Sequence, residues 1–309
     1  MSPTRPPPSF AAAGLQHRLW FERDDAPALR RQLLQSGRLC AGRLDAVQRF
    51  AEQGFVVLRQ ALPASLLQDC WADLDRAQRD GEPLWCHREG VGVFRSDDAA
   101  RRGADPVRAA VHDFHNRSAS TLRLVTHPGF VPLATALLGT DPVLMQSQMF
   151  RHASGKGLHS DHVYYPIAAP LRTLTVWIAA EAVGPHNGGL LLYPGSHRLP
   201  LEPFDDGSWL WPHGEDLQAL QRLHQRWLQR CTAAALVPCT FTAQAGDLLL
   251  FDPRLAHGAQ APQQPGASRR SLALHLAATD AYLADHRPLP QGSRRLQAGG
   301  VWYHQPNLS

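Results

Sequence analysis

The second half of the chain alternates short apolar runs with Gly and Pro. From Asp141 onward, six such runs have the length and the Val, Leu and aromatic content of β-strands. They are VLMQSQMF, LRTLTVWIAA, GLLLYPG, AALVPCTFTA, GDLLLFD and RRSLALHL. Short strands separated by turn residues are typical of an antiparallel sandwich or barrel. We therefore expect the core of this region to be mainly β.

The first half has the longer period of amphipathic helices. Residues 26–44 suit one or two short helices, and residues 45–53 suit a further helix that Gly54 ends. The run Phe55-Val56-Val57-Leu58 then suits a strand, and residues 63–77 have the apolar spacing of another amphipathic helix. Helices therefore flank the predicted β core.

These patterns divide the chain into consecutive regions that we expect to form one globular domain. With 44% hydrophobic and 19% charged residues, the 309-residue chain has ample apolar surface to bury. The expected regions are a disordered proline-rich tail (1–14), a helical N-terminal region with the first strand (15–140), a catalytic core (141–285) with an insertion at 200–230, and a C-terminal extension (286–309). Within the insertion, residues 215–229 suit a helix over the mouth of the barrel.

Charge and cysteine content narrow the choice of partners and of compartment. The net charge is +4, but the chain has a single lysine, Lys156, and its arginines are scattered, so we expect no nucleic-acid partner. Five cysteines without a C-x-x-C pair suggest free thiols in the cytoplasm. Prolines interrupt the N-terminus where a signal peptide needs an apolar stretch, and no run of about 18 apolar residues predicts a membrane span. The oligomeric state stays open.

The strongest chemical signal is His159-Ser160-Asp161, followed about a hundred residues later by His257. On a strand, residues two apart point to the same side, so His159 and Asp161 are expected to address one ion. A histidine from a distant strand would complete one face of an octahedron. Two imidazoles and one carboxylate leave coordination positions open, which is typical of non-haem Fe(II) oxygenases.

The sequence also leaves room for other classes of protein. With 16 histidines in the chain, a His-x-Asp sequence also arises by chance, and a zinc protein or a non-catalytic cupin-like barrel is the alternative. Ser196 beside His197 lacks the second glycine of a serine hydrolase's G-x-S-x-G turn. The run Gly155-Lys156-Gly157 lacks the Ser or Thr and the upstream glycine of a phosphate loop. In contrast, Arg269 lies twelve residues after His257, where a buried guanidinium could hold a dicarboxylate.

Five segments together resemble the phytanoyl-CoA dioxygenase family of Fe(II)- and 2-oxoglutarate-dependent oxygenases. They are FAEQGFVVLRQALP, LHSDHVYYP, NGGLLLYPGSH, GDLLLFDPRLAHG and SRRSLALHL, and the resemblance covers roughly residues 46–285. It implies a double-stranded β-helix (jelly-roll, cupin-like) core with flanking helices, an α+β fold. It also implies Fe(II) as cofactor, with 2-oxoglutarate and O2 as co-substrates.

The resemblance also implies roles for individual residues. His159, Asp161 and His257 would be the iron ligands, and Arg269, with Arg270 as the fallback, would bind the distal carboxylate of 2-oxoglutarate. Ser271 shares a strand face with Arg269 and could assist. Trp177 and Gln148 match positions that line the co-substrate pocket. Ala259 departs from the family pattern, because a hydroxyl residue usually stands two places after the second histidine.

The implied reaction is hydroxylation of an unactivated carbon in a small metabolite or natural-product intermediate, with release of succinate and CO2. Halogenating relatives replace the metal carboxylate with a small residue, so Asp161 favours hydroxylation over halogenation. Desaturation, epoxidation and ring formation use the same ligands and stay open. Aromatic residues near the metal segment, Tyr164, Tyr165 and Trp211, are the expected substrate contacts.

Overall fold

The computed structural model describes residues 17–88, 92–98, 109–165, 167, 169–211, 217–283 and 294–305. The tail expected at residues 1–14 lies outside the described residues, as do the first two residues of the helix expected at 215–229. No helix in the described ranges is long and apolar enough to cross a bilayer.

Two β-sheets make up the core, as the spacing of the apolar runs predicted. The large sheet has the order β1 (Phe55–Leu58), β9 (Leu248–Phe251), β6 (Thr173–Ala179), β11 (Ser271–Ala278), β5 (Pro142–Phe150), β4 (Ala110–His112), β2 (Trp85–Arg88) and β3 (Gly92–Arg95). The hairpin of β12 (Arg294–Ala298) and β13 (Val301–Gln305) joins it at β5. The small sheet has the order β10 (His257–Ala259), β7 (Leu190–Leu192) and β8 (Cys239–Phe241).

The register of the large sheet separates an inner from an outer face. Leu249, Trp177, Ala273 and Gln148 lie side by side on four neighbouring strands and therefore point the same way. The first three pack in an inner apolar cluster with residues of the small sheet. The alternate residues of these strands pack outward in the main core with the N-terminal helices. Both faces of the central strands are thus buried, which explains their nearly continuous apolar runs.

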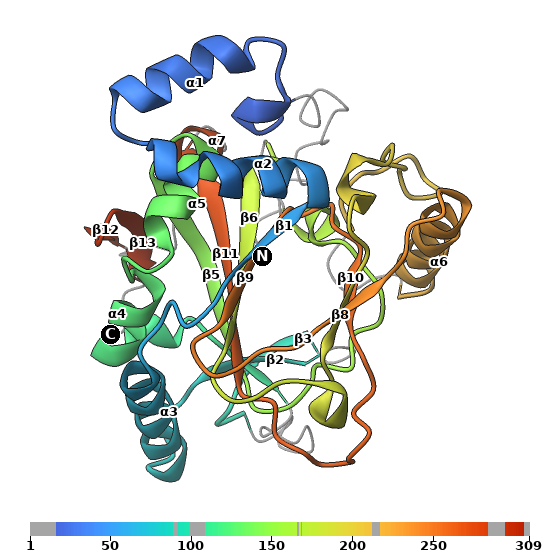
Figure 1. Ribbon diagram of the computed structural model, residues 1–309. Helices are drawn as coiled ribbons and strands as arrows, with labels where there is room; N and C mark the ends of the chain where they lie inside the picture. Colours follow the sequence, from blue (N-terminus) through green and yellow to red (C-terminus); the bar gives the residue numbers. More distant parts are fainter. Residues whose placement is uncertain are drawn as a thin grey trace, which may run out of the picture.

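Helices cover the outer face of the large sheet and one side of the small sheet (Figure 1). Those on the large sheet are α2 (Leu44–Gln53), α3 (Ala64–Arg79), α4 (Ala119–Val125) and α5 (Val131–Leu138), with α1 (Ala26–Gln35) above α2. Two others are α6 (Leu217–Ala233), beside the small sheet, and α7 (Thr279–Leu283), which follows β11. Gly54 ends α2 with φ of 83°, as predicted, and a Cβ atom there would lie 2.5 Å from the His197 ring.

The predicted double-stranded β-helix fold is confirmed, and all six expected strands are present. The helix expected at 215–229 corresponds to α6. The distant strand expected to carry His257 is β10. Strands β2, β3 and β4 and the hairpin of β12 and β13 were not predicted from the sequence. Strands β2, β3 and β4 have only three or four residues each, and their sequences lack the uninterrupted apolar runs that identified the other strands.

A buried histidine beneath β5 makes stability depend on pH. Burial lowers the pKa of His115 to about 4, and its Nδ1 lies 2.8 Å from the Ser147 hydroxyl. Because the unfolded chain binds a proton near pH 6.5 and the folded chain does not, the free energy of unfolding falls as pH falls from about 6.5 toward 4. We expect His115→Gln to reduce the slope of the free energy of unfolding against pH by about 1.4 kcal/mol per pH unit in this range.

Chemical denaturation at pH 7.0, 6.0 and 5.0 measures that slope. The matched control is His186→Gln, because His186 is exposed. An equal slope in the two variants would show that His115 takes up a proton in the folded protein.

Candidate metal and co-substrate site

His159 and His257 are neighbours although 98 residues separate them in sequence. They form an isolated antiparallel bridge, in which each backbone N–H donates to the other's carbonyl oxygen at 2.8 and 2.9 Å. Asp161 does not continue a strand, contrary to the prediction. It begins a 3-10 helix (Asp161–Tyr164), and its N–H donates to the carbonyl of Pro253 at 2.7 Å. The chain therefore turns the Asp161 carboxylate toward His159 by bending rather than by strand alternation.

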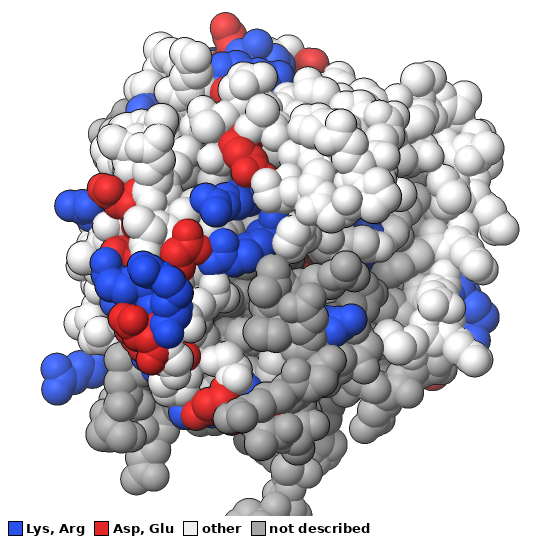
Figure 2. Space-filling model, turned by 90° about the horizontal axis from the view of Figure 1, so that it is seen from below, with Lys and Arg blue, Asp and Glu red and all other residues white. Residues whose placement is uncertain are grey.

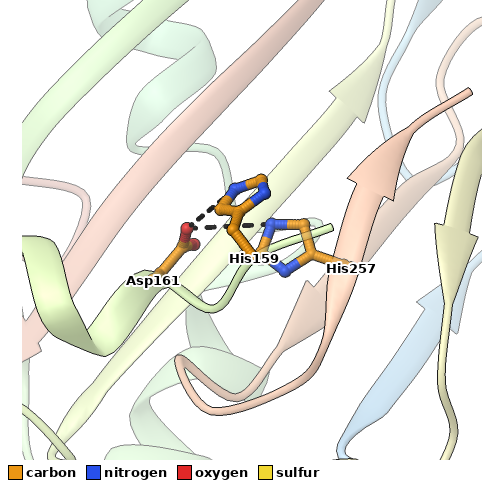
Figure 3. Close-up of side chains that lie close together, drawn as sticks. All are labelled: His159, Asp161 and His257. Carbon is orange, nitrogen blue, oxygen red and sulfur yellow. Dashed lines mark ion pairs between the residues drawn. The ribbon is translucent and has the colours of Figure 1, made fainter. Parts of the chain in front are cut away.

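The three side chains converge on one point (Figure 3). One carboxylate oxygen of Asp161 lies 3.5 Å from Nε2 of His159 and 3.7 Å from Nε2 of His257. One ligand atom from each residue lies within 4.8 Å of the others, and all three residues are buried. Among the described residues, these three side chains form a cluster of histidine and acidic groups with the spacing of a metal site.

Hydrogen bonds fix the orientation of each of these three side chains. Nδ1 of His159 donates to the carbonyl of Gly157 at 2.7 Å, and Nδ1 of His257 donates to that of Leu255 at 2.9 Å. A neutral imidazole that donates through Nδ1 carries its lone pair on Nε2. The other Asp161 oxygen accepts a 2.7 Å hydrogen bond from Thr175. The three ligand atoms that face one another are therefore the ones left available for a metal ion.

The electrostatics agree with that assignment. Burial lowers the pKa of His159 well below its ordinary range and also lowers the pKa of His257, so both rings are neutral at pH 7. Burial alone would raise the pKa of the Asp161 carboxyl, but His257 and His159 beside it hold that pKa well below its usual value. Two neutral imidazoles and one carboxylate on one side of an ion match the ligand set of non-haem Fe(II) oxygenases.

Arg269 lies deep in the barrel, and none of the described acidic residues pairs with it. It precedes β11 and is 2% exposed. Its Nη1 donates to the carbonyl of Gly188 at 2.9 Å, whereas its buried Nε finds no hydrogen-bond partner in the described part of the chain. Burial lowers the pKa of Arg269 to about 10, and no described acidic side chain counteracts it. A buried guanidinium of this kind fits a ligand carboxylate, since an unpaired buried charge is costly.

Ser271 and Trp177 lie on the same inner face of the large sheet. The hydroxyl of Ser271 is buried and has no partner among the described residues. The Trp177 ring lies 5.7 Å from the Arg269 guanidinium carbon, within cation–π range. The unsatisfied Nε and hydroxyl groups are polar atoms that a bound dicarboxylate such as 2-oxoglutarate would satisfy.

Arg270 points elsewhere. Its guanidinium lies 5.2 Å from the ring of Trp71 on α3 and 3.9 Å from Asp75. Trp71 belongs to the core on the outer face of the large sheet. The structure therefore brings Arg269, and not Arg270, into the barrel with Ser271.

Gln148 faces the barrel interior. It lies in the row with Ala273 and Trp177. Its side-chain amide lies 3.0 Å from Nε2 of His112, on β4.

The three aromatic residues expected at the substrate differ in position. The ring of Tyr164 lies 6.2 Å from that of His159 and packs edge-on against Trp211 at 5.9 Å. Its hydroxyl is 3.5 Å from Nε2 of His224 on α6. Tyr165, in contrast, is buried, and its hydroxyl lies 3.0 Å from that of Thr175. Tyr164 thus lies beside His159 with Trp211 packed behind it, whereas Tyr165 lies against the Thr175 hydroxyl that donates to Asp161.

Three residues near the site were missed from the sequence: Thr175, His224 and His275. Thr175 and His275 lie opposite each other on β6 and β11, on the face that Trp177 and Ser271 share. Strand alternation from Trp177 and Ser271 could have identified both. His224 carried no such signal, because its position depends on how α6 packs; its ring lies 5.9 Å from that of His159.

Comparison with known proteins agrees with this site. The profile described as "Phytanoyl-CoA dioxygenase (PhyH)" matches residues 50–271. The chain belongs to the phytanoyl-CoA dioxygenase family. Human peroxisomal phytanoyl-CoA dioxygenase is 22% identical over 266 residues, covering 82% of this chain and 73% of the human protein. The ectoine dioxygenase of Nocardia farcinica is 28% identical over 225 residues, covering 69% of this chain and 71% of that enzyme.

Solved structures share the fold. The epimerase SnoN from nogalamycin biosynthesis superposes with a TM-score of 0.59 at 20% identity, covering 86% of this chain and 98% of SnoN. EctD from S. alaskensis, solved with 2-oxoglutarate and 5-hydroxyectoine, gives a TM-score of 0.55 at 21% identity, covering 79% of this chain and 78% of EctD. Family membership and the His-Asp-His cluster together make this member of the family an oxygenase that uses iron and 2-oxoglutarate.

Proposed function

We propose that this oxygenase hydroxylates an unactivated carbon of a small, largely uncharged metabolite or natural-product intermediate and releases succinate and CO2. Fe(II) would be held by His159, Asp161 and His257, and the distal carboxylate of 2-oxoglutarate by Arg269. The observation that carries the proposal is the pairing of two preformed features in one barrel. One is a buried set of three metal-ligand atoms, and the other is a buried guanidinium with an unsatisfied N–H.

Each residue has a defined task in this scheme. Bound iron, with 2-oxoglutarate and O2, supplies the oxidising chemistry. Thr175 holds Asp161 through its 2.7 Å hydrogen bond, so that the other carboxylate oxygen faces the two imidazoles. Arg269 and Ser271 would orient the co-substrate from the far end by its distal carboxylate. The inner apolar cluster around Trp177 and Phe251 limits the access of water to the reaction.

The substrate class is suggested by the wall of the barrel next to Asp161. Alongside Thr175 lie His275 and then Gln146, on successive strands of the inner face. The Gln146 amide lies 3.1 Å from Nδ1 of His112. Burial lowers the pKa of His275 and lowers that of His112 to about 3, so both rings are neutral. This wall therefore offers hydrogen-bond donors and acceptors without charge.

Basic and acidic side chains are mixed on one face of the molecule. On the face shown in Figure 2, basic side chains lie beside acidic ones instead of forming a broad positive area. Uncharged polar groups in the barrel and aromatic rings at Tyr164 and Trp211 suit a ligand with an apolar framework that carries hydroxyl or carbonyl groups. Succinate release, measured across a panel of neutral oxygenated compounds, acyl-CoA thioesters and amino-acid derivatives, tests this preference. Activity confined to the thioesters would contradict it.

Asp161 determines the expected outcome of the reaction. The Asp161 carboxylate would occupy the coordination position that halogenating relatives leave free for chloride. We expect a product heavier than the substrate by one oxygen atom, and labelled when the gas is isotopically labelled O2. Mass spectrometry in the presence of excess chloride measures this. A product lighter by two hydrogens would indicate desaturation or ring closure with the same ligands, whereas a chlorinated product would contradict the role given to Asp161.

A further inference from the structure

One loop contacts two of the three proposed metal ligands. It comprises residues 252–256 and connects β9 with β10. The carbonyl of Pro253 accepts hydrogen bonds from the N–H groups of Asp161 at 2.7 Å and of His162 at 3.0 Å. The carbonyl of Leu255 accepts from Nδ1 of His257 at 2.9 Å. A shift of this loop would therefore move Asp161 and rotate the His257 ring together.

A buried ion pair gives the loop its shape. One carboxylate oxygen of Asp252 accepts from the backbone N–H and the Nε of Arg254, both at 2.8 Å. The other oxygen accepts from Nη2 of Arg254 at 2.7 Å. Both side chains are 1% exposed. A bidentate ion pair of this kind holds the loop in one geometry. Loss of either partner is destabilising, because it leaves an uncompensated buried charge.

The second partner of Arg254 comes from far away in the sequence. Glu22 ends a short 3-10 helix (Trp20–Glu22), and its Oε1 accepts from Nη2 of Arg254 at 2.7 Å. The neighbouring Trp20 fixes this segment, since its indole N–H donates to the carbonyl of Ala136 at 2.8 Å. Glu22 precedes the part of the chain that matches the family profile, residues 50–271. The contact is thus made by a segment outside the shared region.

We propose that Glu22 and Arg254 are positioning residues for the metal ligands. Through them, the N-terminal segment sets the loop that holds Asp161 and His257. Nη1 of Arg254 and Oε2 of Glu22 are buried without hydrogen-bond partners among the described residues. Among the described residues, Asp252 and Glu22 are the acidic partners of Arg254. The inference rests on the proposed metal site, and it adds a dependence of that site on residues that do not touch the ion.

The test is the affinity of the full-length chain for Fe(II) under anaerobic conditions, measured by competition with a chelator. Loss of an outer partner of metal ligands typically weakens metal binding about 10- to 100-fold. We expect Glu22→Gln to raise the Fe(II) dissociation constant by about tenfold. The matched control is Asp25→Asn, which removes the exposed Arg23–Asp25 ion pair of the same segment. We expect its dissociation constant to equal that of the unaltered chain.

Two further readouts separate positioning from simple loss of stability. The absorption spectrum of the Co(II)-substituted protein, which reports ligand geometry, should change in Glu22→Gln and not in Asp25→Asn. Thermal unfolding of the metal-free proteins shows how much stability each variant loses. A lower unfolding temperature with unchanged Fe(II) affinity and Co(II) spectrum would overturn the inference, as would no effect at all. Failure of the unaltered chain to bind Fe(II) would instead overturn the proposed metal site, and this inference with it.

Discussion

Replacing His257 with Ala is expected to abolish succinate formation and to remove Fe(II) from the purified protein. The substitution deletes one of three ligand atoms, and the described structure offers no fourth protein ligand in the cluster to compensate. Two remaining ligands cannot define the face of an octahedron that the chemistry requires. The same result is expected for His159→Ala. Metal content after anaerobic reconstitution, measured beside succinate formation, tests both.

A control must show that the variants fail through the site and not through unfolding. His186→Ala serves for this purpose because His186 is exposed and comes from another part of the chain. It should keep both iron and activity. Far-ultraviolet circular dichroism should show that all three variants remain folded. Near wild-type succinate formation by either site variant would mean that His159 and His257 do not hold the iron.

Arg269→Ala is expected to raise the requirement for 2-oxoglutarate strongly while leaving iron content nearly unchanged. Removing one side of a buried charged pair costs about 3 to 5 kcal/mol. This corresponds to an increase of about a hundredfold to several thousandfold in the co-substrate KM. The Arg269 side chain is buried, so water cannot readily replace its guanidinium.

Arg270→Ala is the matched control for this experiment. It removes the adjacent arginine, whose guanidinium lies against Trp71 and Asp75. The co-substrate KM should stay near the wild-type value. If Arg270→Ala raised the KM and Arg269→Ala did not, the co-substrate would bind by a different arrangement from the one proposed.

The sequence predicted the elements whose pattern is repeated along the chain. Runs such as GDLLLFD are apolar on both sides because β9 is buried between the outer helices and the small sheet, and that burial leaves a clear signal. Strand β4 has three residues, and its identity depends on pairing with β2 and β5. The local sequence pattern does not record contacts between distant segments, so this strand could not be predicted.

In the candidate site too, the sequence predicted the residues but not their contacts with distant segments. Metal-binding chemistry marked His159, Asp161 and His257 as a group, and the structure brings them together. The predicted local geometry was wrong, because the backbone bends at Asp161 to donate to Pro253, a residue of the loop between β9 and β10. The contact of Glu22 with Arg254 spans 232 residues and could be found only from the folded structure.

The central claim is that His159, Asp161 and His257 hold one iron ion while Arg269 binds 2-oxoglutarate. A crystal grown anaerobically with Fe(II) and 2-oxoglutarate tests it most directly, with anomalous diffraction at the iron absorption edge. The account predicts one iron peak bonded to both Nε2 atoms and to Asp161, and a carboxylate of the co-substrate against the Arg269 guanidinium. An iron peak bonded to other residues, or 2-oxoglutarate bound away from Arg269, would contradict it.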